Sequence, residues 1–203
     1  MTSIGSSAFW NCTTLTSITI GNEVTSIGNS AFFNCVNLAN VTIGNGVTSI
    51  ESYAFYGCSG LTSVTIPASV TRIGWYAFCG CSGLMSVTIP ASVTRIGGYA
   101  FCGCSGLTSV TIPDGVTSIE DCAFYGCSGL TSLTIGNNVK NIGSGAFAGC
   151  NNLADVIILA ESGVADEIKQ KMIDAGVNSN INWIYLNKVF EKEGRYCVIT
   201  NIQ

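Results

Sequence analysis

Hydrophobic and polar positions recur along this chain every 23 residues. Residues 58–80 read CSGLTSVTIPASVTRIGWYAFCG, and residues 81–103 read CSGLMSVTIPASVTRIGGYAFCG. The two segments differ at two positions only, Thr62/Met85 and Trp75/Gly98. A fixed period of this length is typical of a solenoid, in which each coil buries its apolar side against its neighbours. The pattern therefore predicts one elongated stack of coils.

Columns of equivalent residues run through seven consecutive units. An isoleucine column consists of Ile4, Ile27, Ile50, Ile73, Ile96, Ile119 and Ile142. A cysteine column consists of Cys12, Cys35, Cys58, Cys81, Cys104, Cys127 and Cys150. An Ala-Phe pair and a leucine recur with the same period, from Ala8-Phe9 to Ala146-Phe147 and from Leu15 to Leu153. Because residues at a fixed period stack coil on coil, these columns predict a continuous core.

Each unit contains a short alternating segment. In Ser63-Val-Thr-Ile66 the period of two predicts a strand, with the apolar side chains inward and Ser63 and Thr65 outward. Prolines 67, 90 and 113 end this strand in the middle coils, because proline cannot donate to a ladder. Residues 70–73 predict a second extended piece. The spacing of Ala54, Cys58 and Leu61 predicts a helical turn.

The period ends after residue 159, and the composition changes with it. Of the 20 charged residues, 12 follow residue 150. Residues 162–175 predict a helix with Ser162 as N-cap, Asp166 and Glu167 in its first turn, and an apolar face of Val164, Ile168 and Met172; Gly176 ends it. A strand over 181–186 and a hairpin of 188–191 with 196–200 complete a C-terminal cap. We therefore expect two parts, a repeat array at 1–160 and a cap at 161–203.

Composition and charge exclude several classes of protein. Charged residues make up only 10% of the chain, and the net charge of −4 comes without a basic patch, which argues against nucleic-acid binding. Histidine is absent, so the commonest proton shuttle and metal ligand is missing. No apolar run is long enough to span a membrane, and residues 1–10 lack the features of a signal peptide.

The repeated pattern I-G-x-x-A-F-x-x-C-x-x-L-x-x-V-x-I-P resembles the BspA-type leucine-rich repeat over residues 1 to 160. The resemblance implies a right-handed superhelix or horseshoe with a parallel β-sheet on one face and short extended pieces and helical turns on the other. It also implies a binding role at a cell surface or in secreted form. Since this chain shows no export signal, a cytoplasmic location stays open. The resemblance transfers no ligand.

The first coil starts in the middle of a unit, because Met1 stands where later coils have valine at 24, 47 and 70. An uncovered sheet edge favours pairing with another chain. Two interpretations follow: the chain is a fragment of a longer protein, or the first coil is covered by self-association.

Eleven cysteines raise the question of disulfides and metal. The seven of the column should be buried as small hydrophobic residues, and coil spacing disfavours a ladder of disulfides. The pairs Cys79/Cys81 and Cys102/Cys104 hold four thiols on adjacent coils, but each pair should point to opposite sides, so we expect no zinc site. An exposed disulfide or a reactive pair between Cys79 and Cys102 is an alternative. The redox state of Cys79, Cys102, Cys122 and Cys197 is left open.

The outward positions of the strands form a grid of short side chains. A solenoid sheet, expected here to be concave, is the usual binding surface, while threonine also suits a soluble strand without any ligand. The candidate positions, which we call the strand face, are Ser63, Thr65, Met85, Ser86, Thr88, Ser109 and Thr111. Serine and threonine hydroxyls in regular rows are also typical of an ice-binding surface, although a curved sheet does not match the flat surface of ice.

A second candidate surface is aromatic. Its residues are Tyr53, Trp75, Tyr76 and Tyr99, which predict either a platform for a protein or sugar or a packing ladder. Arg72 and Arg95 also stack, and we expect surface ion pairs with Glu51 and Glu120, with an anion-binding arginine pair as the alternative.

The repeats offer no catalytic constellation and no phosphate-binding loop, so we expect neither an enzyme nor a cofactor. The sequence favours a non-catalytic adhesion or interaction module. Its partner would be a protein, with a host matrix protein or glycan among the candidates, and without membrane insertion. The alternative is a structural spacer or stalk of a larger surface protein.

Overall fold

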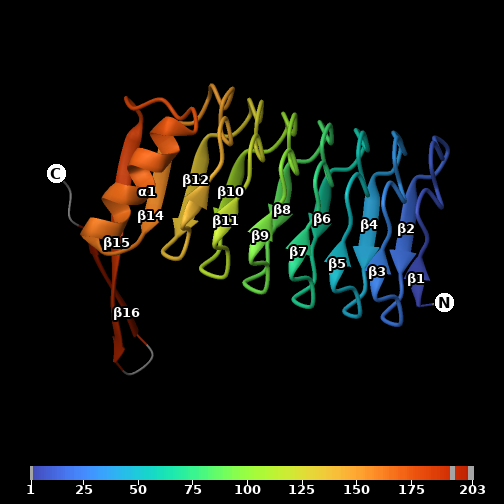
Figure 1. Ribbon diagram of the computed structural model, residues 1–203, viewed down its shortest axis with the longest axis horizontal. Coiled ribbons are helices and arrows are strands. Elements are labelled where there is room, and N and C mark those ends of the chain that lie inside the picture. The colour runs from blue at the N-terminus through green and yellow to red at the C-terminus, as the bar shows by residue number, and fades with distance from the viewer. Residues whose placement is uncertain (1, 193–194, 201–203) are drawn as a thin grey trace.

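The computed structural model describes the backbone of residues 2–192 and 195–200 and the side chains of 2–161 and 163–186. It is a parallel β-solenoid whose coils stand side by side in one row, with β1 at one end and β14, β15 and the helix α1 at the other (Figure 1). The repeat solenoid expected from the sequence is confirmed, and its strands pair in register at the 23-residue period.

Two rows of parallel strands run along the solenoid. One is a seven-stranded sheet in the order β1 (Ser3–Ile4), β3 (Ser26–Ile27), β5 (Ser49–Ile50), β7 (Arg72–Ile73), β9 (Arg95–Ile96), β11 (Ser118–Ile119), β13 (Asn141–Ile142). The other row begins with a four-stranded sheet, β2 (Ser17–Ile20), β4 (Asn40–Ile43), β6 (Ser63–Thr65), β8 (Ser86–Thr88). It continues as a five-stranded sheet, β10 (Ser109–Ile112), β12 (Ser132–Gly136), β14 (Asp155–Leu159), β15 (Asn182–Lys192), β16 (Arg195–Thr200).

The strands follow from the sequence pattern. Their apolar residues are buried and their Ser and Thr residues are exposed, as in the alternation of Ser63-Val64-Thr65. β6 and β8 end two residues before Pro67 and Pro90, and β10 ends directly before Pro113. The second extended piece is also present as β7, although it covers only residues 72–73.

The helical turn expected at residues 54–61 is wrong. Successive turns occupy this segment, and Tyr53 and Gly57 have φ of 60° and 70°, in the left-handed region that an α-helix excludes. The backbone N–H groups of Tyr53, Phe55 and Gly57 instead donate to carbonyls of the next coil at 2.7–2.8 Å. The turns thus form a third coil-to-coil ladder. Ala54, Cys58 and Leu61 are buried as expected, but a series of turns rather than a helical turn directs their side chains inward.

The core is the set of columns seen in the sequence. Phe32, Phe55, Phe78, Phe101 and Phe124 are fully buried, and consecutive rings of the phenylalanine column stack with centroids 5.0–5.4 Å apart. Every described residue of the cysteine column after Cys12 is buried too. Each of these thiols donates to the carbonyl oxygen of a phenylalanine 26 residues earlier, as Cys58 does to Phe32 at 3.1 Å. The thiol therefore fills the core and satisfies a backbone acceptor.

The C-terminal segment joins the solenoid. The helix α1 runs over Ser162–Asp174, so its N-cap is Glu161 rather than Ser162, and Asp166 and Glu167 lie in its second turn. Its buried face consists of Ala165, Ile168 and Met172, whereas Val164 is exposed, which corrects the expected face. Gly176 ends the helix at a φ of 100°.

β15 continues the ladder by pairing in parallel with β14, and it forms the expected antiparallel hairpin with β16. The hairpin tip at Glu193-Gly194 and the side chain of Cys197 lie outside the described residues. The division of the chain at residue 160 stays a prediction.

Candidate binding surfaces

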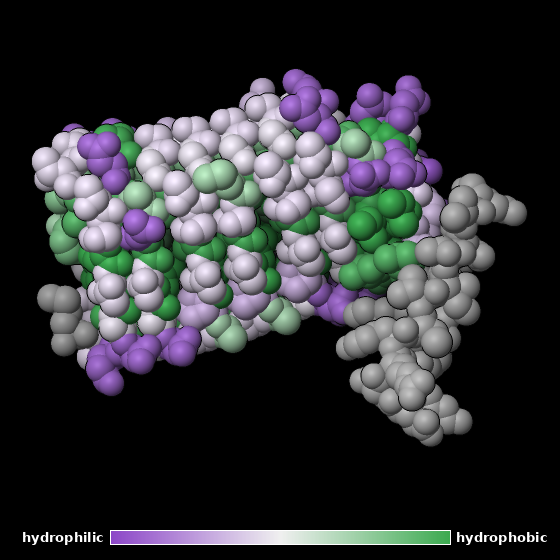
Figure 2. Space-filling model, turned by 180° about the vertical axis from the view of Figure 1, so that it is seen from behind, coloured by the Kyte–Doolittle hydropathy of each residue, from purple (hydrophilic) through white to green (hydrophobic). Residues whose placement is uncertain are grey.

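The strand face is an ordered array of short, exposed side chains. Ser63 pairs with Ser86 and Thr65 with Thr88 in the β6–β8 register, and all four are exposed. Ser109 and Thr111 continue the same two rows on β10 and are also exposed. Figure 2 shows pale, weakly polar side chains in rows along one long side of the molecule, with green hydrophobic strips between them. Most strongly polar side chains lie at the margins of this side in the same view.

Met85 interrupts the strand face. Its side chain is 56% exposed, in a column where the neighbouring coils have Thr62 and Thr108. It also precedes the point where the row of strands divides, because β8 closes the four-stranded sheet and β10 opens the next one. The two strands stay connected by the Thr108 N–H, which donates to the Met85 carbonyl at 3.4 Å. An exposed thioether thus lies at the seam of the face.

Three of the four aromatic candidates form a ladder on the flank of the coils. The rings of Tyr53, Tyr76 and Tyr99 stack with centroids 4.8 and 4.6 Å apart. A second stack of Trp10, Phe33 and Tyr56 lies beside it, joined by a tilted contact between Tyr53 and Tyr56 at 5.8 Å. The packing-ladder interpretation accounts for these stacks.

Backbone strain accompanies the tyrosine ladder. Tyr53, Tyr76 and Tyr99 have φ of 60°, 57° and 56°, a conformation that costs a bulky residue about 1–2 kcal/mol. Ring stacking with the neighbouring coils offsets this cost. Cys122 follows Tyr99 in the same column at φ 55°. A hydrogen bond with the Cys122 side chain is the largest of the causes that raise the pKa of Tyr99 to about 12.

Trp75 is separate from the tyrosine ladder. Its indole is 53% exposed and leans toward the next coil, where the equivalent residue is Gly98. A Cβ atom built on Gly98 would lie 3.8 Å from Cδ2 of the indole. The sequence shows the Trp75/Gly98 difference, but only the structure shows that it opens a groove.

The described thiols outside the core column, those of Cys79, Cys102 and Cys122, are free. All ten cysteines with described side chains are unbridged, including the half-buried Cys79 and Cys102. Burial, followed by the neighbouring Cys102, raises the pKa of Cys79 to about 12, so its reactive thiolate is disfavoured. Cys81 and Cys104 lie in the core, whereas Cys79 and Cys102 lie half-buried on the flank. The two thiols of each Cys-x-Cys pair therefore do not meet. Within the described chain, no group of three or more Cys, Asp or Glu side chains is arranged to hold a metal.

Arg72 and Arg95 are both engaged in ion pairs, as the ion-pair interpretation predicts. Arg72 pairs with Glu51 of the preceding coil at 2.7 Å, and Arg95 pairs with Glu120 of the following coil. The two guanidinium groups therefore point toward different coils, and each is already paired with a carboxylate. This arrangement does not favour an anion site shared by both arginines.

Sequence reasoning missed a threonine column beside the seven-stranded sheet. Thr48, Thr71 and Thr94 are exposed, and each hydroxyl donates to the carbonyl of the threonine 23 residues earlier, at 3.2–3.5 Å. The signal was present in the sequence, because threonine recurs at this column from Thr2 to Thr117. These hydroxyls support the coil stacking.

The remaining carboxylates of the repeats are spread along the array. Five carboxylates of the repeats, those of Glu23, Glu51, Asp114, Glu120 and Asp121, lie between strands, whereas Asp155 begins β14. Among the described residues, no helix is both long and apolar enough to cross a lipid bilayer.

The period, the columns and the solenoid define a leucine-rich repeat protein. The family model for the BspA type leucine rich repeat region matches residues 2–104 and 71–198, with six copies. The chain belongs to this family. Its members are repeat modules that generally take part in protein interactions, and they are often surface or secreted proteins.

Solved structures agree with this assignment. The chain is similar to a leucine-rich repeat protein of T. pallidum (TpLRR), with a TM-score of 0.73 and 28% identity over 90% of this chain and 80% of that chain. The pneumococcal vaccine antigen PcpA has a TM-score of 0.54 and 16% identity over 91% of this chain and 66% of its own, a likeness of fold alone. No curated protein matches the chain.

Proposed function

We propose that this protein is a non-catalytic interaction module that binds a protein partner through its strand face and flanking loops, at a cell surface or in secreted form. The observation that carries the proposal is the array of exposed, uncharged residues on β6, β8 and β10 around Met85. Membership of a family of interaction repeats supports it.

The physical properties of the strand face suit a partner surface. Serine and threonine have little rotamer freedom to lose when a partner covers them, so ordering them costs little entropy. The backbone beneath them is fixed by in-register pairing, which keeps the array preorganised. Met85 adds a flexible apolar contact at the centre, of the kind that adapts to different partners.

A binding screen tests the proposal. The purified chain is passed over immobilised extracellular-matrix proteins and glycans, beside a variant with Thr65→Lys, Thr88→Lys and Thr111→Lys. Three long cations on this face should abolish binding to the partner that the screen finds. A charge-matched control carries Thr48→Lys, Thr71→Lys and Thr94→Lys, whose side chains are exposed outside the strand face. The control should bind within about twofold of the parent.

The outcomes separate the functions. Binding that is lost in the first variant and kept in the control places the partner on the strand face. Binding kept in both variants moves the site to the tyrosine flank. No binding to any member of the panel favours the spacer, and thermal hysteresis of freezing that the first variant loses would favour ice binding.

The first coil supports a second, smaller proposal of self-association. In the part of the chain that the structure describes, β1 and β2 each pair with one neighbour, and Phe9, Leu15 and Ile18 are partly buried where later members of their columns are buried. Two such ends would cover each other's apolar side chains. Sedimentation over a range of concentrations should show a dimer that Ile18→Lys prevents; a monomer at all concentrations contradicts it.

A further inference from the structure

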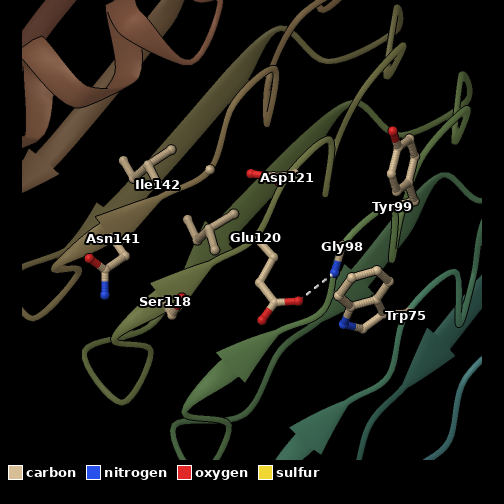
Figure 3. A pocket seen from close by; sticks show the side chains of 10 residues that line it. Trp75, Gly98, Tyr99, Ser118, Glu120, Asp121, Asn141 and Ile142 are labelled. Atoms are coloured by element: carbon tan, nitrogen blue, oxygen red, sulfur yellow. Dashed lines mark hydrogen bonds between the residues drawn. The ribbon is translucent and has the colours of Figure 1, made fainter.

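A groove of about 400 Å³ lies on the flank beside Trp75. Figure 3 shows its lining: Trp75 and Gly98 at one end, Ser118 and Asn141 at the other, and Glu120 between them. Trp75 and Gly143 belong to coils three apart, so at a coil spacing of about 4.8 Å the groove is roughly 14 Å long.

Gly98 keeps the groove open. In the preceding, nearly identical coil the same column holds Trp75, so an indole is compatible with this backbone position. A Cβ atom on Gly98 would lie 3.3 Å from the Asp121 carbonyl oxygen and 3.8 Å from the Trp75 ring. A large side chain at 98 would therefore occupy the space in front of Trp75. With glycine there, the indole remains 53% exposed as one wall.

The polar side of the groove is held in place. The Glu120 side chain is only 12% exposed, accepts a hydrogen bond from the Gly98 N–H at 3.0 Å and pairs with Arg95. Oδ1 of Asp121 accepts from the Ser144 N–H at 2.9 Å, which orients an exposed carboxylate. Ser118 adds a hydroxyl and Asn141 an exposed amide. The groove thus presents donors and acceptors beside one aromatic face.

This combination matches a neutral sugar better than a cation. A pyranose ring has an apolar C–H face that packs on an indole, and hydroxyls at its edge that both donate and accept hydrogen bonds. A cation needs only acceptors, and the more buried carboxylate of the groove, Glu120, is already neutralised by Arg95. The volume and length suit a disaccharide.

We propose that this groove binds a neutral saccharide of two rings, one stacked on Trp75 and the other held through its hydroxyls by Ser118, Asn141 and Asp121. The residues that line the groove do not include Thr65, Thr88 or Thr111. The proposal of a saccharide site and the proposal of a protein-binding strand face can therefore be refuted separately. The triple lysine variant of the strand face should therefore keep its saccharide affinity.

Calorimetry of the full chain with neutral disaccharides tests the proposal. The probes are cellobiose, maltose, lactose, mannobiose and chitobiose at millimolar concentration, with lysine and tetramethylammonium as cationic probes. At least one disaccharide should bind, and Trp75→Ala should weaken it at least about tenfold. Gly98→Trp, which copies the preceding coil, should weaken it as strongly by filling the groove. Trp10→Ala removes another exposed tryptophan and should change the affinity by less than about twofold.

Three results would overturn the proposal: no disaccharide binds, binding survives Trp75→Ala, or only the cationic probes bind. Circular dichroism of each variant shows whether the coil stack is intact. If Gly98→Trp unfolds the protein, the saccharide affinities of Trp75→Ala and Trp10→Ala are compared instead. Both variants remove an exposed tryptophan side chain, so a loss of affinity in Trp75→Ala alone supports the groove.

Discussion

The two coils at residues 58–80 and 81–103 have nearly the same sequence and nearly the same core, yet they present different surfaces. Leu61 and Leu84 are both fully buried, and so are Phe78 and Phe101. Their two sequence differences change the surface: Met85 replaces an exposed threonine on the strand face, and the buried Gly98 stands where the preceding coil exposes Trp75. The core columns fix the backbone, and the surface varies without disturbing it.

Identical residues in the two coils also behave differently when their neighbours differ. Arg72 and Arg95 occupy the same column and pair in register on β7 and β9. Arg72 nevertheless reaches back to Glu51, while Arg95 reaches forward to Glu120 and helps to build the groove. The surface chemistry of a coil is therefore set by the coils on either side as well as by its own sequence.

The largest effect should come from the shared core. Phe78→Ala and Phe101→Ala should each lower the free energy of unfolding by about 3–5 kcal/mol, since each ring is fully buried and stacked on both sides. Because the coils are equivalent, the two losses should agree within about 1 kcal/mol, measured by urea unfolding. A loss below about 1 kcal/mol in either variant would contradict a core role for that ring.

The cysteine column should make stability depend on alkaline pH. Burial is the main cause that raises the pKa of Cys58 to about 12, and it raises that of the equivalent Cys81 as well. Because the folded state keeps the proton, this stabilisation is complete below the unfolded pKa of about 9 and is lost as pH rises from there toward 12. Each pH unit in this range should remove at most about 1.4 kcal/mol per thiol.

Thermal melts between pH 7 and pH 11 measure this slope. Cys58→Ala removes one of the titrating groups, so its melting temperature should fall less steeply with pH than that of the parent. Cys12→Ala is the matched control, because Cys12 is only partly buried. If the melting temperature falls equally steeply with pH in all three proteins, the raised pKa of Cys58 in the folded state is contradicted.

A smaller effect should separate ring stacking from backbone strain at Tyr76. Tyr76→Ala loses the stacks with Tyr53 and Tyr99 and keeps a side chain at a φ of 57°. Tyr76→Gly loses the same stacks but relieves the strain, so it should be more stable than the alanine variant by about 1 kcal/mol. Urea unfolding of both variants measures the difference. Equal stabilities would mean that the left-handed conformation stores no strain.

The smallest effect should come from making the strand faces of the two coils alike. Met85→Thr copies Thr62 at an exposed position and should change the free energy of unfolding by less than about 0.5 kcal/mol. Partner binding through the strand face should weaken nonetheless, because the apolar contact at the seam is removed. Thr62→Met is the reciprocal control. A large loss of stability in Met85→Thr but not in Thr62→Met would show that Met85 supports the division between β8 and β10.

The features that recur with the 23-residue period could be predicted from the sequence. The fixed period placed the strands, the isoleucine, phenylalanine and cysteine columns, and the outward Ser63 and Thr65, because equivalent positions must stack. It failed where residue spacing was read without backbone geometry: Ala54, Cys58 and Leu61 have helical spacing, but left-handed residues at Tyr53 and Gly57 make it a series of turns.

The groove beside Trp75 was beyond sequence reasoning for another reason. It arises from a residue that is small where its equivalent is large, and from Glu120 reaching back across a coil boundary to Gly98. Periodicity describes what neighbouring coils share, whereas this site depends on how they differ.

Coil stacking also determines how the molecule would respond to tension. β1 and β15 lie at opposite ends of the row (Figure 1), so a force along the row separates neighbouring coils rather than sliding strands past each other. Parallel ladders loaded in this direction open one hydrogen bond at a time. Each detached coil would release 23 residues, about 80 Å of extended chain, so the protein would lengthen under load in equal steps.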